Sequence, residues 1–219
     1  MARARQRREV DDPDLPHDLD PPPDGELCTG TAWEAVHVGA GVSVADAAYD
    51  VTIKESLLEA VDLRARRLSG VTCTDVRFEG CDLAGAVLDM AALTRVTFVR
   101  CRMTGTVLSG ARLQDVRLVD CTAGMLALRM TSATYLSIES SSLREADFYE
   151  ASLELSRITD SDLTAADVTG ARVPELDLRG SMLEGLVGAS GLRGAVISSD
   201  QLFGLAGALA AELGITVQP

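Results

Sequence analysis

Three cysteines spaced twenty residues apart are the first candidates for chemistry in this sequence: Cys81, Cys101 and Cys121. Thiolates can bind zinc, but a tetrahedral site needs four converging ligands. Neither histidine, His17 nor His37, lies near these cysteines or at a spacing that would build a nucleophile and its base. No phosphate-binding glycine loop is present. We therefore interpret the cysteines as small core residues, and we expect no metal, no cofactor and no enzymatic activity.

Acidic side chains are the second group of candidates, because a dense set of carboxylates can bind a protein surface that is built to hold DNA. The sequence has 33 Asp and Glu against 20 Lys and Arg, a net charge of −13. Such a charge repels nucleic acids and anionic membranes, so neither is expected as a direct partner. Residues 61–130 carry a net charge of +3, whereas residues 131–170 carry −6. The predicted partner-binding surface is therefore formed by Glu139, Glu145, Asp147, Glu150, Glu154, Asp160, Asp162 and Asp167.

The elements that must position these residues follow from a strict period of five. Every fifth residue from Leu58 to Leu183 is apolar, over 26 consecutive positions. This period matches neither the helix (about 3.6) nor the strand (about 2). A short strict period indicates a chain that coils on itself and buries one residue at each step, which is a solenoid. The residue two before each centre is nearly always small or apolar, and the residue two after it is often glycine, which supplies turn conformations.

A second period, of twenty, indicates how many steps make one coil. The cysteine column continues as Ser141, Ser161 and Ser181, and Phe78 is followed by Phe98 in another column. Residues of one chemistry thus recur every four pentapeptides, as expected if four of them make one square coil. Like residues then stack on like, about 4.8 Å apart.

Three further segments flank this regular body, residues 58–183. Residues 1–27 are first basic and then acidic and proline-rich, so they are predicted to be a disordered tail. Residues 28–57 are predicted to be irregular first coils of a β-helix that spans 28–198. The end, residues 199–219, is predicted to hold a helix over 199–213, with Ser199 as N-cap and Gly214 just after its last residue. Its leucine face is expected to cover the last coil.

The repeated order is a small residue, Asp or another polar residue, Leu or Phe, a polar residue and glycine. It appears, with one departure in each, as CDLAG (81–85), ADVTG (166–170) and LDLRG (176–180). This pattern closely resembles the pentapeptide repeat family over roughly 58–183. The resemblance implies an all-β solenoid, a right-handed quadrilateral parallel β-helix, which often dimerises through its C-terminal end. With the predicted helix as that end, a homodimer is expected through Leu202, Phe203, Ala206 and Leu209.

Within this family, the overall plan looks most like the branch that protects DNA gyrase. Its acidic, rod-like members imitate duplex DNA, bind type II topoisomerases and can confer quinolone or toxin resistance. The resemblance therefore implies DNA gyrase as the favoured protein partner. About eight coils would give a rod of roughly 40 Å, over which duplex DNA presents about 23 charges. Residues 28–219 carry a net charge of −9, so we expect a local DNA-like patch rather than imitation along the whole rod.

Two alternatives to this function are open. Aspartate is a common outward residue of the repeat, as at Asp147, Asp162 and Asp167, so the acidity can serve solubility alone. The protein can also be a scaffold for an unrelated partner, bound through the arginine-bearing residues 61–130 or through the tail. No secretory signal and no membrane-spanning stretch is visible in the sequence, which favours a soluble cytoplasmic protein.

Arg66 is an anomaly in the repeat, because it occupies an inward position that is otherwise small. A buried, unpaired guanidinium is costly. Either a local bulge turns Arg66 outward, or it pairs with an acid such as Asp46 or Glu59.

Overall fold

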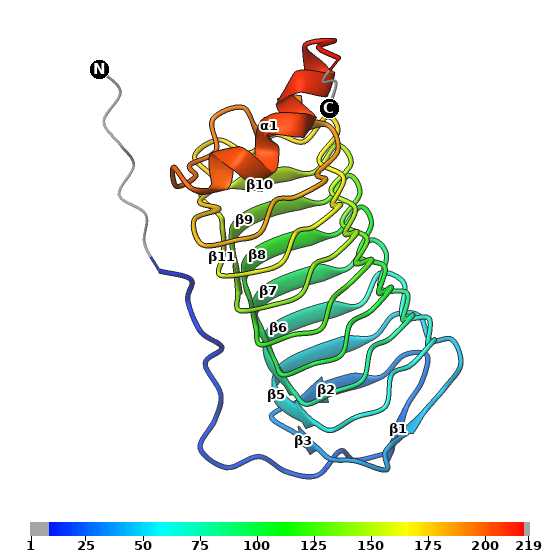
Figure 1. Ribbon diagram of the computed structural model, residues 1–219. Helices are drawn as coiled ribbons and strands as arrows, with labels where there is room; N and C mark the ends of the chain where they lie inside the picture. Colours follow the sequence, from blue (N-terminus) through cyan, green and yellow to red (C-terminus); the bar gives the residue numbers. More distant parts are fainter. Residues whose placement is uncertain (1–8, 217–219) are drawn as a thin grey trace.

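The chain winds into a tall, four-sided coil, which the computed structural model describes over residues 9–216 (Figure 1). Five long strands stack in chain order, and every pairing between them is parallel. They are β5 (Thr52–Glu59), β6 (Thr72–Glu79), β7 (Ala92–Val99), β8 (Arg112–Val119) and β9 (Ser132–Glu139). Each residue pairs with the one twenty positions further on, as Phe78 does with Phe98. The predicted parallel β-solenoid with four pentapeptides per coil is therefore confirmed.

The coil has four sides, which we define on one coil: residues 71–75 form side 1, 76–80 side 2, 81–85 side 3 and 86–90 side 4. Residues that lie twenty positions, or a multiple of twenty, from these belong to the same side. Sides 1 and 2 carry the long strands. Sides 3 and 4 are joined between coils by single bridges, such as Asp82 to Arg102 and Val87 to Val107. The column to which a residue belongs therefore decides which side of the molecule it faces.

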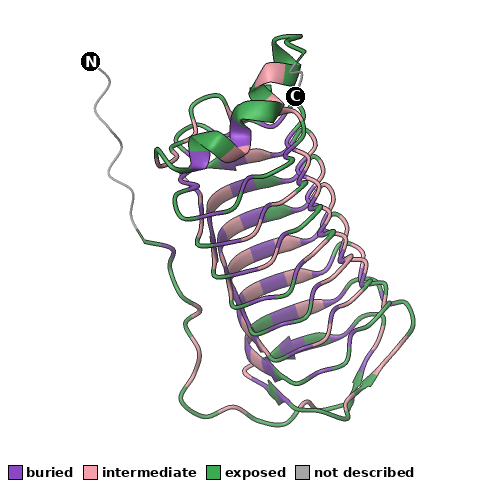
Figure 2. Ribbon diagram, viewed as in Figure 1, coloured by how far each residue is buried: buried purple, intermediate pink, exposed green. Residues whose placement is uncertain are grey.

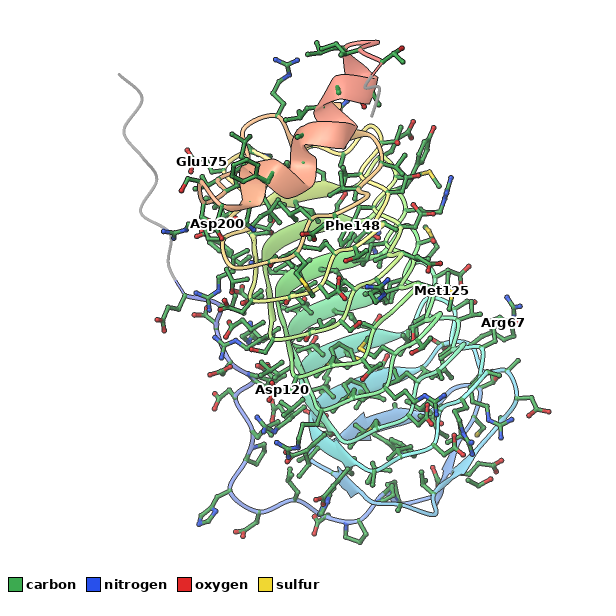
Figure 3. All side chains as sticks on the ribbon, viewed as in Figure 1. Arg67, Asp120, Met125, Phe148, Glu175 and Asp200 are labelled. Carbon is green, nitrogen blue, oxygen red and sulfur yellow. The ribbon has the colours of Figure 1, made fainter. Side chains whose placement is uncertain are left out.

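Every centre of the five-residue period, from Leu58 to Leu183, is buried in one continuous core. Figure 2 shows buried residues repeating at each level of the coil, and Figure 3 shows Phe148 among the coils. The cysteine column lies inside as predicted, and the Cys101 thiol donates to the carbonyl oxygen of Phe78 at 3.5 Å. Ser161 continues this column, and its hydroxyl accepts the backbone N–H of Ser141 at 3.1 Å. Hydroxyls thus replace thiols without leaving a polar group unpaired.

The corners of the coil lie two residues after each centre, and their backbone is left-handed. Glycine is present at some corners, such as Gly85 with φ 67°, as the sequence suggested. At 21 positions, however, a residue other than glycine has a positive φ, for example Met125 and Glu145. Their N–H groups donate to the next coil, Met125 to the Arg144 carbonyl at 2.8 Å. Hydrogen bonds between coils therefore fix a conformation that these residues would otherwise avoid.

The first coils become regular earlier on two sides than on the others. Two short strands, β2 (Ala32–Glu34) and β3 (His37–Val38), pair in register with β5, so sides 1 and 2 begin there. Between β3 and β5 the chain is irregular, and β4 (Ser43–Val44) pairs instead with β1 (Glu26–Leu27).

The expected disordered tail, residues 1–27, differs from expectation over the described residues that begin at Glu9. Residues 9–20 lie along the outside of the coil, where their backbone and carboxylates bind solenoid side chains. The sequence argument considered only apolar burial, whereas these contacts are polar and Val10 is the one side chain of residues 9–20 that is buried. Residues 1–8 lie outside the described part of the chain.

The C-terminal end closes the solenoid. Two short strands, β10 (Ser152–Glu154) and β11 (Arg157–Thr159), extend the sheet beyond β9. A final bridge joins Asp177 to Val196, nineteen residues apart rather than twenty. A short 3-10 helix, η1 (Ala189–Leu192), precedes helix α1 (Gln201–Glu212).

Helix α1 confirms the predicted C-terminal helix and corrects its first turn. Asp200, rather than Ser199, precedes the helix, and the side chain of Gln201 makes the key contacts. The Gln201 amide donates to the carbonyl oxygens of Leu178 and Ser181, both at 2.6 Å, and so caps the last coil. At the other end Gly214 takes φ 68°, as expected for the residue that follows a helix.

The leucine face of α1 covers the coil less completely than predicted. Besides Gln201, only Leu205 is buried in this helix. Within the described residues, no helix is long and apolar enough to cross a membrane.

Candidate interaction surfaces

The eight predicted acidic residues are distributed over all four sides, because the chain passes to the next side of the coil after every five residues. Glu154 is on side 1, and Glu139 and Asp160 belong to side 2. The structure brings the other five together on the adjoining sides 3 and 4. We call this group the acidic patch: Glu145, Asp147, Glu150, Asp162 and Asp167.

Three members of the acidic patch hold the turns of their own sides. The carboxylates of Asp147, Asp162 and Asp167 accept backbone N–H groups two residues further on, at 2.9, 2.9 and 2.8 Å. Asp82 makes the same bond at 3.0 Å outside the patch. Aspartate before a centre thus has a structural role, which the solubility interpretation did not include.

Arginines neutralise part of the acidic patch. Arg129 pairs with Asp147 at 2.7 Å, and Arg144 pairs with Asp162 at 3.1 Å. Burial alone would raise the pKa of Asp162, but hydrogen bonds from Thr164 and the Arg144 guanidinium lower it. Asp162 is therefore charged at neutral pH.

An apolar ridge continues side 4 beyond the acidic patch. Met90 and Met130 lie at the corner of side 4, and Met125 lies at the corner between sides 3 and 4. These methionines are 59%, 56% and 54% exposed. Val87 and Val107 are half-buried on side 4 beside them. Sequence reasoning missed this ridge, although valine and methionine at outward positions of neighbouring columns were the signal.

The four residues predicted to mediate dimerisation all reach the surface of α1. Leu202 and Ala206 are exposed, and Phe203 is 88% exposed. Leu209 lines a groove of about 320 Å³ between α1 and the loop that follows η1, together with Leu192 and Ile197. An apolar surface is thus present at this end of the molecule.

Comparison with known protein families assigns the repeat. Residues 71–129 match the family model for the pentapeptide repeat region. This match identifies residues 71–129 as a pentapeptide repeat region. No curated protein matches the sequence.

Among solved structures, the pentapeptide repeat chain is similar to QnrB1, a plasmid-mediated fluoroquinolone resistance protein. The two are 18% identical with a TM-score of 0.36, and the match covers 77% of this chain and 100% of QnrB1. It is also similar to HetL, a pentapeptide repeat protein involved in heterocyst differentiation regulation, from the cyanobacterium Nostoc sp. strain PCC 7120. Here the identity is 16% and the TM-score 0.33, over 80% of this chain and 91% of HetL. Likeness at this level concerns the fold, which proteins of different function share.

Four of the five cysteines belong to the core. Cys81, Cys101 and Cys121 are buried and free, and burial raises the pKa of the Cys73 thiol to about 12. Over the described residues, no group of histidine, cysteine and acidic side chains is placed to hold a metal ion. Arg66 pairs with Asp46 through its guanidinium and stays half-buried, so pairing explains this residue.

Proposed function

We propose that this pentapeptide repeat protein is a non-catalytic binding protein whose acidic patch engages a protein partner. DNA gyrase is the favoured partner, and protection against a drug or toxin that acts on gyrase is the favoured consequence. The observation that supports the proposal is the convergence of five carboxylates on two adjoining sides, within two neighbouring coils. The choice of gyrase rests on the resemblance of the sequence to the gyrase-protecting branch.

Charge density sets the scale of the imitation. Two coils occupy about 10 Å along the axis, and duplex DNA presents about six charges over that length. The acidic patch offers five carboxylates, and arginines pair with two of them, Asp147 and Asp162. The acidic patch thus approaches the charge of duplex DNA over only about 10 Å of the axis. A homodimer joined through α1 would add a second patch, and a cytoplasmic location belongs to the same proposal.

A gyrase supercoiling assay, with and without a fluoroquinolone, tests the proposal. The decisive variant is Glu145→Lys/Glu150→Lys, because these corner residues do not hold turns through their carboxylates as the patch aspartates do. We expect the wild-type protein to alter supercoiling or drug inhibition at micromolar concentration, and the variant to lose the effect. The matched control, Glu154→Lys/Asp160→Lys, makes the same charge change on sides 1 and 2. Absence of any wild-type effect, or equal loss in both variants, would contradict the proposal.

The second candidate is a scaffold role with an unrelated partner, which the apolar ridge on side 4 favours. Exposed methionines adapt to differently shaped partners. Pull-downs with the wild type and with Met90→Glu/Met130→Glu separate the two functions. A partner lost only in the methionine variant supports the scaffold.

A further inference from the structure

The N-terminal segment runs along one corner of the solenoid (Figure 1). We call residues 9–20 the strap. It descends along the corner between sides 1 and 2, from the coil of β8 past the coil of β6, and then joins the first coils through a bridge between Asp20 and Val36. The strap therefore crosses several coils in an extended conformation.

Two solenoid carboxylates hold the backbone of the strap. Asp115 accepts the N–H of Asp11 at 3.2 Å, and Asp75 accepts the N–H of Asp14 at 3.1 Å. Asp75 and Asp115 lie two coils apart, about 9.6 Å. Three residues of polyproline II chain span about 9.3 Å and make one full turn, so every third N–H points the same way. The spacing between Asp75 and Asp115 thus matches the spacing between every third N–H group of an extended chain.

Sequence and charge complete the fit. Pro13 and Pro16 favour the extended conformation of the strap. Arg117 pairs with the Asp12 carboxylate at 2.9 Å and donates to the Val10 carbonyl at 3.3 Å. Because the two aspartates of the solenoid bind backbone groups, side-chain selection falls mainly to Arg117 and to the burial of Val10.

Two aspartates at the corner beneath the strap are buried, although most residues at the other corners are exposed. Asp75 and Asp115 are 5% and 4% exposed, whereas Asp120, at a corner one side further on, is exposed. Asp75 is also bound by the Arg95 guanidinium, Nε to Oδ1, at 2.6 Å. The Gln114 side-chain amide donates to the Asp115 carboxylate at 2.6 Å, so solenoid side chains position both aspartates.

The strap itself is held lightly. Val10 is its one buried side chain among residues 9–20. A segment with so few buried apolar contacts opens at much lower free energy than the coil beneath it. The strap can therefore leave the corner while the solenoid stays folded.

We propose that this corner, formed by Asp75, Arg95, Asp115 and Arg117, is a recognition surface for an extended acidic segment of a partner protein. The strap is its built-in competitor and covers the surface in the free protein. The matching ligand has polyproline II conformation and an apolar residue two positions before an acid, as Val10 precedes Asp12. This surface lies on sides 1 and 2 and is independent of the acidic patch on sides 3 and 4.

Fluorescence anisotropy with a labelled peptide of residues 9–20, EVDDPDLPHDLD, tests the proposal on the full-length chain. The variant Val10→Asp/Asp12→Arg removes the apolar and ionic anchors of the strap but leaves the surface intact. We expect it to bind the peptide at least about tenfold more tightly than the wild type, because the competitor is weakened. The matched control, Leu19→Asp/Asp18→Arg, makes the same change in charge outside the anchors and should behave as the wild type.

Two further measurements decide the outcome. Adding Arg117→Glu to the opened variant should abolish peptide binding. Hydrogen exchange should show that the Asp11 and Asp14 amides lose protection in the opened variant while β7 keeps it. Failure to bind the peptide once those amides exchange freely would overturn the proposal. So would amides that stay protected, or opened chains that self-associate without binding the peptide, since the occupant would then be a second copy.

Discussion

The rings of Phe78 and Phe98 stack with their centroids 4.8 Å apart and their planes 11° apart. The two residues are twenty positions apart and belong to paired strands, so this stack measures the rise of one coil directly. The core is therefore organised in columns that run along the axis, in which equivalent side chains lie one coil apart. Damage to one column member should be felt by both neighbours.

Removing one ring from this stack should cost stability. Phe98→Ala leaves a cavity in a solenoid that has no other side chains to fill it, and we expect a loss of about 3–5 kcal/mol in the free energy of unfolding. Urea denaturation followed by circular dichroism measures this loss. Phe203→Ala is the matched control, because Phe203 is 88% exposed and its truncation should change stability by less than about 0.5 kcal/mol.

The glycines at the C-terminal end differ in what surrounds them. A Cβ atom on Gly191 would lie 1.9 Å from the carbonyl oxygen of Val168, so Gly191→Ala must displace backbone and should destabilise the final coil. A Cβ atom on Gly207, inside α1, would meet nothing within 4 Å. Gly207→Ala should instead stabilise the protein by up to about 1 kcal/mol. Thermal melts of the two variants should shift in opposite directions, and equal shifts would contradict this description of the end.

Dimerisation through α1 is a proposal that sedimentation can test. Phe203→Glu places a charge on the most exposed part of the predicted interface, so a homodimer should dissociate to a monomer at tens of micromolar. Met125→Glu is the control, since Met125 is also an exposed apolar residue but lies on the side of the coil (Figure 3). A wild-type protein that sediments as a monomer would remove the proposal.

Stability should fall in acid partly through Asp75. The hydrogen bond from Arg95 lowers the pKa of this carboxyl group in the folded state, below its unfolded value of about 3.9. Its contribution is therefore complete above about pH 4 and is lost as the pH falls through the lowered pKa. Asp75→Asn should be less stable than the wild type at pH 7, and the difference should shrink at pH 3. Asp24→Asn, an exposed control, should follow the wild type at both pH values.

The repeat made the fold predictable, because one inward residue in every five determines both the core and the coil. The centres from Leu58 to Leu183 and the cysteine column follow from it, whereas the terminal helix was predicted from its leucines and cap residues. The first turn of that helix could not be read from capping rules. Gln201 is buried there to satisfy carbonyls of the last coil, a tertiary demand that local sequence does not express.

The candidate surfaces were predictable only in part. A sequence range such as 139–167 passes around all four sides, so its net charge says little about any one face. Assigning residues by column separates Asp147 and Asp167 on side 4 from Glu154 on side 1, and the period of twenty already contained that information. The strap was beyond reach, because Asp11 and Asp115 are 104 residues apart and no periodicity connects them.

The nearly constant coil length has a consequence for insertions and deletions in this chain. Each pentapeptide turns the backbone through a quarter of a circle, so five residues added between β8 and β9 would keep the inward pattern. Every residue after the insertion, including Asp167 and the residues of α1, would then be rotated by a quarter turn about the solenoid axis relative to the strap. Twenty added residues would instead lengthen the rod and leave its orientation unchanged. Insertion or deletion of one pentapeptide thus changes the angle about the axis between two binding faces. Insertion or deletion of a whole coil changes the distance between them along the axis.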